Sequence, residues 1–287
     1  AEDAAELVEV DWEPLDVVVD TRAALEPGAV LLHPEAGTNV ATDRSFAFGP
    51  VDEAFARAAH VVRGEYTFPR YSSVPMECYG VVAHWGVEDV EVWANFHGPF
   101  TMVPVAAGAL GVPVSRFRLH VPADIGGSFG IKAGIYPYVV LLALASKHAG
   151  TPVRWTEDRV EHLLAATHAR DHRYVLRAGF AADGELLAVK ADVWCNAGAY
   201  SVYPWTAGIE PLMAGGLLTG PYKLADYECT VRGVATNTSP SGPYRGVARP
   251  STVFAMEALM DSGARALGTD PIALRRRNLI LPADVPY

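Results

Sequence analysis

The sequence predicts an α+β fold, in which strands and helices are mixed without strict alternation. Residues 174–180 and 186–195 are strand-like runs on either side of Asp183-Gly184, a typical hairpin turn because glycine adopts the positive φ that the turn needs. Residues 252–267 instead repeat apolar side chains at helical spacing and are followed by Gly268, a residue typical of helix C-caps. The 287 residues, 50% of them hydrophobic, suffice for one large domain or two ordinary ones.

The first part of the chain predicts short elements. We expect the end of a helix and then two strands, at 7–10 and 17–19, within the first 19 residues. Residues 21–43 are rich in Pro, Gly and Ala and indicate an extended connector. Residues 52–60 form a short amphipathic helix with acidic residues in its first turn. Further strand-like runs are 61–68, 80–85, 90–94 and 117–121, and a helix is predicted at 102–110.

The rest of the chain continues this mixture. The run 136–148 is helix-like, and the most apolar stretch, 135–145, is too short to span a bilayer and predicts a buried helix. A strand at 153–155 and a helix at 160–166 follow it. After Gly268, Asp270-Pro271 is a typical helix start, with Asp as the N-cap and Pro in the first turn. The basic run 275–277 then lies in the last turn of that helix, where cations favour the helix dipole.

Charge and cysteine content exclude several classes of function. The net charge of −10 argues against a nucleic-acid partner, since phosphate binding requires clustered Lys and Arg. The three cysteines are Cys78, Cys195 and Cys229, far apart and without a CxxC pair. This spacing predicts neither a zinc site nor an iron–sulfur cluster within the chain. Sparse cysteines are typical of the reducing cytoplasm, and we expect no membrane association.

The segment 124–132, Asp-Ile-Gly-Gly-Ser-Phe-Gly-Ile-Lys, is the first candidate for chemistry. Three glycines lie between a strand-like run and a helix-like run. Glycine lets the backbone approach a ligand and present bare N–H groups, which suits an anionic or oxo-bearing group. The alternative is an ordinary tight turn. A phosphate or nucleotide binder of another class is disfavoured, since the spacing is neither GxxxxGK[ST] nor GxGxxG.

Four segments together resemble the molybdenum-binding large subunits of the xanthine dehydrogenase family. This family includes aldehyde oxidases and aerobic carbon monoxide dehydrogenases. The segments are, in order, 124–132, Thr236-Asn237-Thr238, 243–250 (Pro-Tyr-Arg-Gly-Val-Ala-Arg-Pro) and 268–279. The resemblance implies that residues 51–287 are the first molybdopterin-binding domain, 1–25 the tail of a preceding hammerhead-like domain, and 26–50 an extended connector. The second molybdenum domain would then lie outside the chain, and we expect the chain to be a piece of a larger protein.

The resemblance also implies a function and its partners. It implies a molybdenum–molybdopterin cofactor in the cytosine dinucleotide form, with no protein ligand to the metal. The enzyme would oxidise an aldehyde or an N-heterocycle, a small-molecule substrate, with oxygen derived from water. Electrons would pass to [2Fe-2S] clusters and FAD on partner subunits. The alternative is a non-catalytic scaffold piece of the same complex.

The glycine segment supplies the implied cofactor contacts. Gly127, Ser128, Phe129 and Gly130 match the family loop beside the metal, where glycine is usual at the position of Ser128. Phe129 is expected to present its N–H near a metal oxo group, and the alternative is a core aromatic. Residues 196–200 also follow the family pattern, either as a strand exit or as part of the cofactor lining.

The segment 243–250 supplies the implied catalytic residue. Arg245 matches the substrate-facing arginine of the family, which holds an oxyanion through charge-assisted hydrogen bonds. Carbon monoxide dehydrogenases carry a copper-binding cysteine at the place of Gly246. Glycine has no ligand atom, so the resemblance implies an enzyme that is not of the copper type, with Gly246 beside the cofactor.

Two further residues complete the predicted site. His97 stands where the family has a glutamine that bonds an oxo group, and an imidazole N–H can donate the same bond, although imidazole also titrates near neutral pH. The alternative is an ordinary loop histidine. Glu77, in Pro75-Met76-Glu77, is expected to support the substrate site. The catalytic base of the family is a glutamate in the second molybdenum domain, so no base is predicted within this chain.

Overall fold

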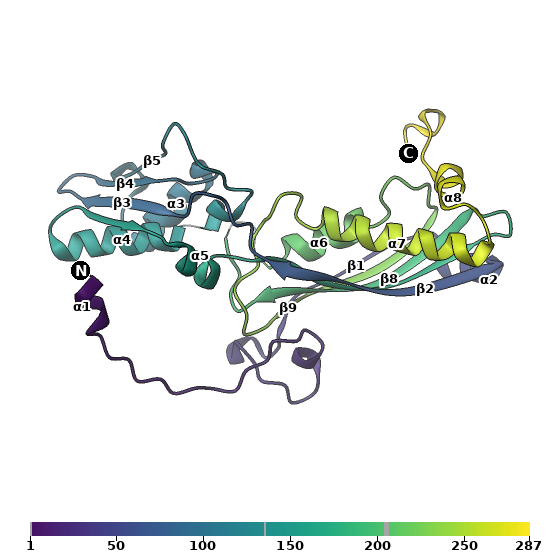
Figure 1. Cartoon of the computed structure of the whole chain (residues 1–287), viewed down its shortest axis with the longest axis horizontal. Coiled ribbons are helices and arrows are strands. Elements are labelled where there is room, and N and C mark those ends of the chain that lie inside the picture. Colours follow the sequence, from purple (N-terminus) through teal and green to yellow (C-terminus); the bar gives the residue numbers. More distant parts are fainter. Residues whose placement is uncertain (1, 135, 204–206) are drawn as a thin grey trace.

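Two β-sheets organise the molecule, a computed structural model in which residues 2–134, 136–203 and 207–287 are described. A five-stranded and a four-stranded sheet lie next to each other along the longest axis, the larger at the right of Figure 1. Each sheet contains both parallel and antiparallel pairs. Because helices and strands do not alternate strictly, the α+β prediction is confirmed.

The larger sheet has the strand order β1-β9-β8-β7-β2. Its strands are β1 (Val40–Phe48), β2 (His60–Tyr71), β7 (Ala169–Phe180), β8 (Leu186–Gly198) and β9 (Asp226–Ala235). The pair β8–β9 is parallel and the other three pairs are antiparallel. The hairpin predicted around Asp183-Gly184 is the β7–β8 pair, and Gly184 has the positive φ of 86° that its turn requires.

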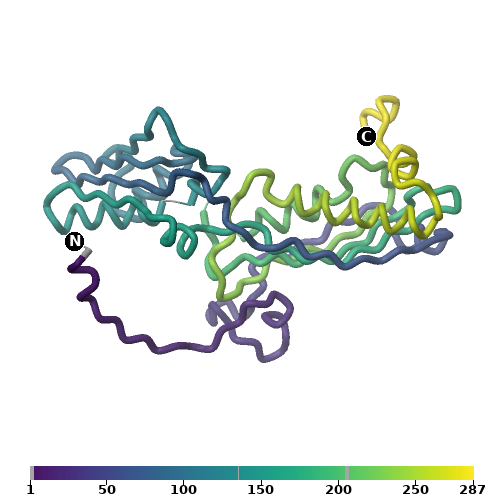
Figure 2. The backbone as a smooth tube through the Cα atoms, in the orientation of Figure 1, coloured from purple at the N-terminus to yellow at the C-terminus, as the bar shows by residue number. Residues whose placement is uncertain are grey.

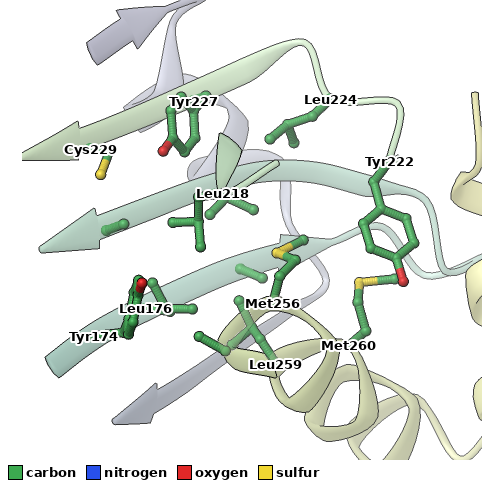
Figure 3. Close-up of a cluster of buried hydrophobic side chains, with 14 of the residues drawn as sticks. Tyr174, Leu176, Leu218, Tyr222, Leu224, Tyr227, Cys229, Met256, Leu259 and Met260 are labelled. Carbon is green, nitrogen blue, oxygen red and sulfur yellow. The ribbon is translucent and has the colours of Figure 1, made fainter. Parts of the chain in front are cut away.

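One face of this sheet carries the larger hydrophobic core. Along β7, alternate side chains point to the same face, so Tyr174, Leu176 and Phe180 are all fully buried. They pack against α6 (Ile209–Leu217) and α7 (Arg249–Leu267), which cover that face in Figure 1. Figure 3 shows Met256 and Met260 of α7 pointing toward the sheet, with Met260 directed at Tyr222, which precedes β9. This core fixes the end of β9 and the start of α7, between which a site loop runs.

The smaller sheet builds a separate core. It has the order β5-β4-β3-β6, with β3 (Gly80–Trp85), β4 (Val90–Ala94), β5 (Phe117–His120) and β6 (Val153–Thr156). Helices α3 (Pro99–Leu110) and α4 (Tyr136–Ala149) pack on it through buried residues such as Met102, Val139 and Ala143. The helix predicted in this region is α4, but it is not buried on all sides, because Leu141 and Leu144 are exposed. Residue 135 of the predicted apolar stretch lies outside the described residues.

The remaining helices follow the capping signals of the sequence. α2 (Val51–Arg57) has two acidic residues in its first turn. α5 (Arg159–Ala165) begins with a capping box between Asp158 and Glu161. Gly268 ends α7 in the left-handed region, and Asp270 caps α8 (Pro271–Asn278) by accepting from the N–H of Ala273 at 2.8 Å. No helix in the described ranges is both long and apolar enough to cross a membrane.

The N-terminal region differs from the sequence expectation. Residues 7–19 contain no strand after α1 (Glu2–Glu6), and they run outside both sheets in Figure 2. Val18 is tied to Asn237 by two hydrogen bonds, of 2.7 and 2.8 Å. The stretch 26–50, expected to be a connector, includes β1, an edge strand of the larger sheet. The prediction also lacked β9 and α6.

Candidate functional site

Two loops meet between the two sheets. The glycine loop (124–132) connects β5 to α4, and the arginine loop (243–249) leads from β9 into α7. The N–H of Arg245 donates to the carbonyl oxygen of Phe129 at 2.8 Å. A Cβ on Gly130 would lie 2.2 Å from the carbonyl oxygen of Pro243, so only glycine permits this approach. The structure therefore brings together the two segments predicted to form the site.

The backbone of these loops presents unused hydrogen-bond donors. Gly127, Phe129 and Gly130 all have positive φ, which turns successive N–H groups toward one side. Within the described part of the chain, the N–H groups of Ser128, Phe129 and Gly246 donate to no acceptor. The ring of Phe129 is 46% exposed, so it is not the core aromatic of the alternative reading. Unpaired backbone donors of this kind suit an oxygen-rich or anionic ligand.

A cavity of about 330 Å³ adjoins the glycine loop. It is lined by residues 95–98 and by Ile125, Gly127 and Ser128. His97 lines it, and its Nδ1 lies 2.9 Å from the hydroxyl oxygen of Ser128. The two residues for which the resemblance implied a departure from the family pattern, His97 and Ser128, are thus in direct contact.

Glu77 lies beneath the glycine loop and is bonded to it from both sides. The Gly126 N–H donates to its carboxylate at 3.0 Å, and the Glu77 N–H donates to the Gly126 carbonyl at 3.2 Å. The same carboxylate pairs with Lys132, whose side chain is completely buried. Partial burial raises the pKa of Glu77, but the bonds from Lys132 and Gly126 outweigh burial and hold that pKa below its usual range. These contacts place Glu77 where it can support the loop.

The arginine loop is held by Arg170, a residue at the start of β7. Its buried guanidinium donates to the carbonyl oxygens of Arg245 at 2.8 Å and of Val247 at 3.0 Å. Its carbon Cζ lies 4.9 to 5.6 Å from three aromatic ring centres, including that of Tyr244. Burial lowers the pKa of Arg170. The two donated bonds flank Gly246 and fix Val247 at its positive φ of 53°.

The side chain of Arg245, in contrast, has no bonding partner among the described residues. Its backbone N–H and carbonyl are both bonded, as described, and fix its position. The residue is exposed, and among the described residues its guanidinium has no ion pair or hydrogen bond. A fixed backbone with a free cationic head can serve a ligand anion without rearrangement of the loop.

The segment 196–200 has a structural role in these contacts. A Cβ on Gly198 would lie 2.2 Å from the carbonyl oxygen of Ser239, so this glycine permits close packing of two backbones. The side-chain oxygen of Asn196 accepts from the Gly198 N–H at 3.0 Å and from the Thr236 hydroxyl at 2.6 Å. Of the two alternatives for this segment, the contacts favour the strand exit.

A second polar group lies behind Glu77. Atoms of Cys78, Glu157 and His162 approach within 4.8 Å of one another, a set with the ligand types of zinc sites that the cysteine spacing did not predict. Glu157 is nevertheless engaged already, since one carboxylate oxygen is 2.9 Å from the Tyr79 N–H and 2.7 Å from His162 Nδ1. These two bonds brace the segment that carries Glu77, whereas Glu157 Oε1 and His162 Nε2 are buried without a partner among the described residues.

Replacing Gly130 with alanine should force the two loops apart. The new Cβ would meet a backbone carbonyl at 2.2 Å, at a φ of 115° that alanine disfavours. We expect a loss of about 3 kcal/mol in the free energy of unfolding, measured by denaturant titration. Gly108→Ala is the matched control, because this exposed helical glycine has open space around it and should be neutral or stabilising. Equal stability of the Gly130→Ala variant would show that the loops are not in contact.

Two residues of the site were missed by sequence reasoning. Arg170 lies in a strand, and nothing in its neighbours indicates a buried cation. Lys132 stands inside the glycine segment, where its spacing fits neither nucleotide-binding pattern, so it received no role. An alternating strand with an inward-pointing arginine is the one signal that could have singled out Arg170.

Comparisons with known proteins show which family the chain resembles. The model of the molybdopterin cofactor-binding domain matches residues 32–279. The chain is 38% identical to the gamma subunit of the 6-hydroxypseudooxynicotine dehydrogenase complex of Paenarthrobacter nicotinovorans, covering 100% of this chain and 36% of the relative. It is 32% identical to the carbon monoxide dehydrogenase large chain of Afipia carboxidovorans, over 100% of this chain and 37% of the relative.

A solved structure has the same fold. Quinoline 2-oxidoreductase of Pseudomonas putida 86 superposes with a TM-score of 0.93 at 37% identity, over 100% of this chain and 36% of that one. The chain thus spans little more than a third of the length of these three relatives. The family match, the fold and the two loops lead to one conclusion: the chain belongs to the molybdopterin cofactor-binding domain family, within the molybdenum-binding large subunits related to xanthine dehydrogenase.

Proposed function

We propose that this chain is the cofactor-binding part of a molybdenum hydroxylase that oxidises an N-heterocycle or an aldehyde. The observation that carries the proposal is the set of unpaired backbone donors at Ser128, Phe129 and Gly246, together with the unpaired guanidinium of Arg245, whose backbone joins the two loops. An oxygen-bearing group fits these groups, because backbone N–H groups and a guanidinium all donate hydrogen bonds.

Some residues of the chain would hold the cofactor, and Arg245 would stabilise charge on the substrate. When bound, a molybdenum–pterin group would supply the two-electron oxidation of a carbon, in which a C–H bond and water give a C–OH bond, two protons and two electrons that would pass to partner subunits. The N–H groups of Ser128 and Phe129 would hold oxygen atoms of that group. Arg245 would stabilise negative charge that develops on the substrate. The catalytic base would come from the second molybdenum domain.

The names of the relatives favour a nitrogen heterocycle as substrate. Quinoline, named in the solved structure, is a fused nitrogen heterocycle, and 6-hydroxypseudooxynicotine contains a pyridine ring. A carbon monoxide dehydrogenase is also a relative. Gly246 has no side-chain atom to bind copper, so an enzyme of the copper type is not proposed.

The proposed partner subunits and cofactor form are those that membership of the family implies. Iron–sulfur and FAD subunits would receive the electrons, and the cofactor would be the cytosine dinucleotide form. The three free thiols suit a reducing compartment such as the cytoplasm. The alternative of a non-catalytic scaffold is not favoured, because a scaffold has no use for an uncommitted cation beside unpaired donors.

We expect the isolated 287-residue chain to retain no stable molybdenum and to show no activity, since the rest of the cofactor cradle is proposed to lie elsewhere. The test is metal analysis and substrate-dependent dye reduction with quinoline and an aromatic aldehyde, for the chain alone and for the complete enzyme. Stoichiometric molybdenum and turnover in the chain alone would refute this expectation. A complete enzyme without molybdenum would refute the proposed function itself.

A further inference from the structure

The hydroxyl oxygen of Ser128 makes three polar contacts. It lies 3.2 Å from the backbone nitrogen of Gly130 and 3.3 Å from that of Lys132. Its third contact is Nδ1 of His97, at 2.9 Å. Two of the partners are backbone N–H groups, which can only donate hydrogen bonds.

These contacts determine which ring nitrogen of His97 carries hydrogen. A serine hydroxyl has two acceptor lone pairs and a single hydrogen to donate. The N–H groups of Gly130 and Lys132 occupy both lone pairs, so the contact to His97 must use the hydrogen of the hydroxyl. Nδ1 therefore accepts, and in the neutral ring the hydrogen resides on Nε2.

The ring is also fixed from its backbone side. The N–H of His97 donates to the carbonyl oxygen of Lys132 at 3.4 Å, so both the backbone and the side chain of His97 are joined to the glycine loop. The residue lines the cavity of about 330 Å³. Among the described residues, Nε2 has no hydrogen-bond partner. The remaining donor of the ring is therefore available to a ligand.

We propose that Ser128 is a positioning residue that holds neutral His97 as an Nε2–H donor, and that the cavity takes a ligand presenting an oxygen acceptor to this donor. The unpaired N–H groups of Ser128 and Phe129 are further donors of the same loop. Glu77 does not line this cavity, and oxygen Oε2 of its carboxylate accepts from Gly126 and Lys132. This inference rests on the proposed function only for the identity of the ligand, an oxygen atom of the cofactor.

The protonation pattern is measurable by nitrogen NMR on the full chain without any cofactor. The chain is labelled with ¹⁵N-histidine. Long-range ¹H–¹⁵N correlations from the hydrogens on the ring carbons then distinguish a ring nitrogen that carries hydrogen from one that does not. The resonances of His97 are identified by their loss in the His97→Gln variant. At pH ~8, where imidazoles are ordinarily neutral, we expect a bare Nδ1 and a protonated Nε2.

Substitution of Ser128 gives the decisive comparison. Ser128→Ala removes the donor to Nδ1, so the ratio of the Nδ1–H form to the Nε2–H form should rise about fivefold, the effect of one ordinary hydrogen bond on an equilibrium. Ser128→Thr retains a hydroxyl and should restore the original ratio. Ser73→Ala is the matched control, because the Ser73 hydroxyl contacts only the backbone carbonyl of Ser128, at 3.5 Å, and its loss should leave the ratio unchanged.

Two results would overturn the proposal. One is hydrogen on Nδ1 of His97 in the unsubstituted chain. The other is an unchanged ratio in Ser128→Ala when circular dichroism shows that this variant is folded. Neither measurement involves molybdenum, so failure here is distinct from failure of the proposed function, which the metal content of the complete enzyme decides.

Discussion

Replacing Arg245 with alanine in the complete enzyme is expected to lower kcat/KM by ~10² or more, the usual effect of removing a group that stabilises charge in the transition state. The backbone of Arg245 is bonded to Phe129 and Arg170, whereas its guanidinium has no partner in the described part of the chain. The substitution should therefore remove only the charged head and leave the loop in place.

Matched variants separate charge from loop geometry. Arg276→Ala removes an exposed arginine on α8 and should leave kcat/KM unchanged. Arg245→Lys keeps the charge but loses the planar fork, so we expect an intermediate rate. Normal kinetics in Arg245→Ala, with a normal molybdenum content, would show that Arg245 is peripheral to the reaction.

The second large effect is expected from the pair between Glu77 and Lys132. The Lys132 side chain is 0% exposed, whereas that of Glu77 is 42% exposed. Glu77→Ala leaves a buried ammonium without its counter-charge and should cost about 3 kcal/mol of unfolding free energy. Lys132→Met instead leaves a carboxylate that reaches water and still accepts from Gly126, so it should cost within about 1 kcal/mol.

This asymmetry is tested by denaturant titration of both variants. A larger cost for Lys132→Met than for Glu77→Ala would mean that the lysine stem, rather than the ion pair, holds the loop.

The same pair should make the free energy of unfolding depend on pH in the acid range. The folded-state pKa of Glu77 lies below its usual range. Its contribution to stability is therefore complete above the unfolded pKa of ~4.3 and is lost as the pH falls below that value toward the lower folded-state pKa. Unfolding free energies measured between pH 6 and about 3 should show this loss in the unsubstituted chain. They should show less of it in Glu77→Gln, which cannot titrate.

The elements that were predicted well are those whose signals are local. The β7–β8 hairpin follows from Asp183-Gly184, and the ends of α7 and α8 follow from Gly268 and Asp270, because turns and caps depend on neighbouring residues. β1 and β9 were missed, since each is defined by its pairing with a strand distant in sequence. The reverse error occurred at residues 7–19, where apolar residues suggest strands but no strand pairs with them.

The site shows the same limit. Motif matching indicated both loops, and the structure brings them together through Arg245 and Phe129. Motif matching could not indicate that Arg170 anchors the arginine loop, or that Ser128 contacts His97. These contacts join residues far apart in the chain. The roles of the individual site residues remain predictions that the experiments above address.

The separation of the two hydrophobic cores has a consequence for how the protein melts. Each sheet has its own buried cluster, and between them the two site loops are in contact. Bodies joined in this way can lose their structure in separate thermal transitions. A ligand that contacts both loops binds only when both bodies are folded, so its binding free energy adds to the stability of each. Such a ligand would couple the unfolding of the two bodies and merge the two thermal transitions into one.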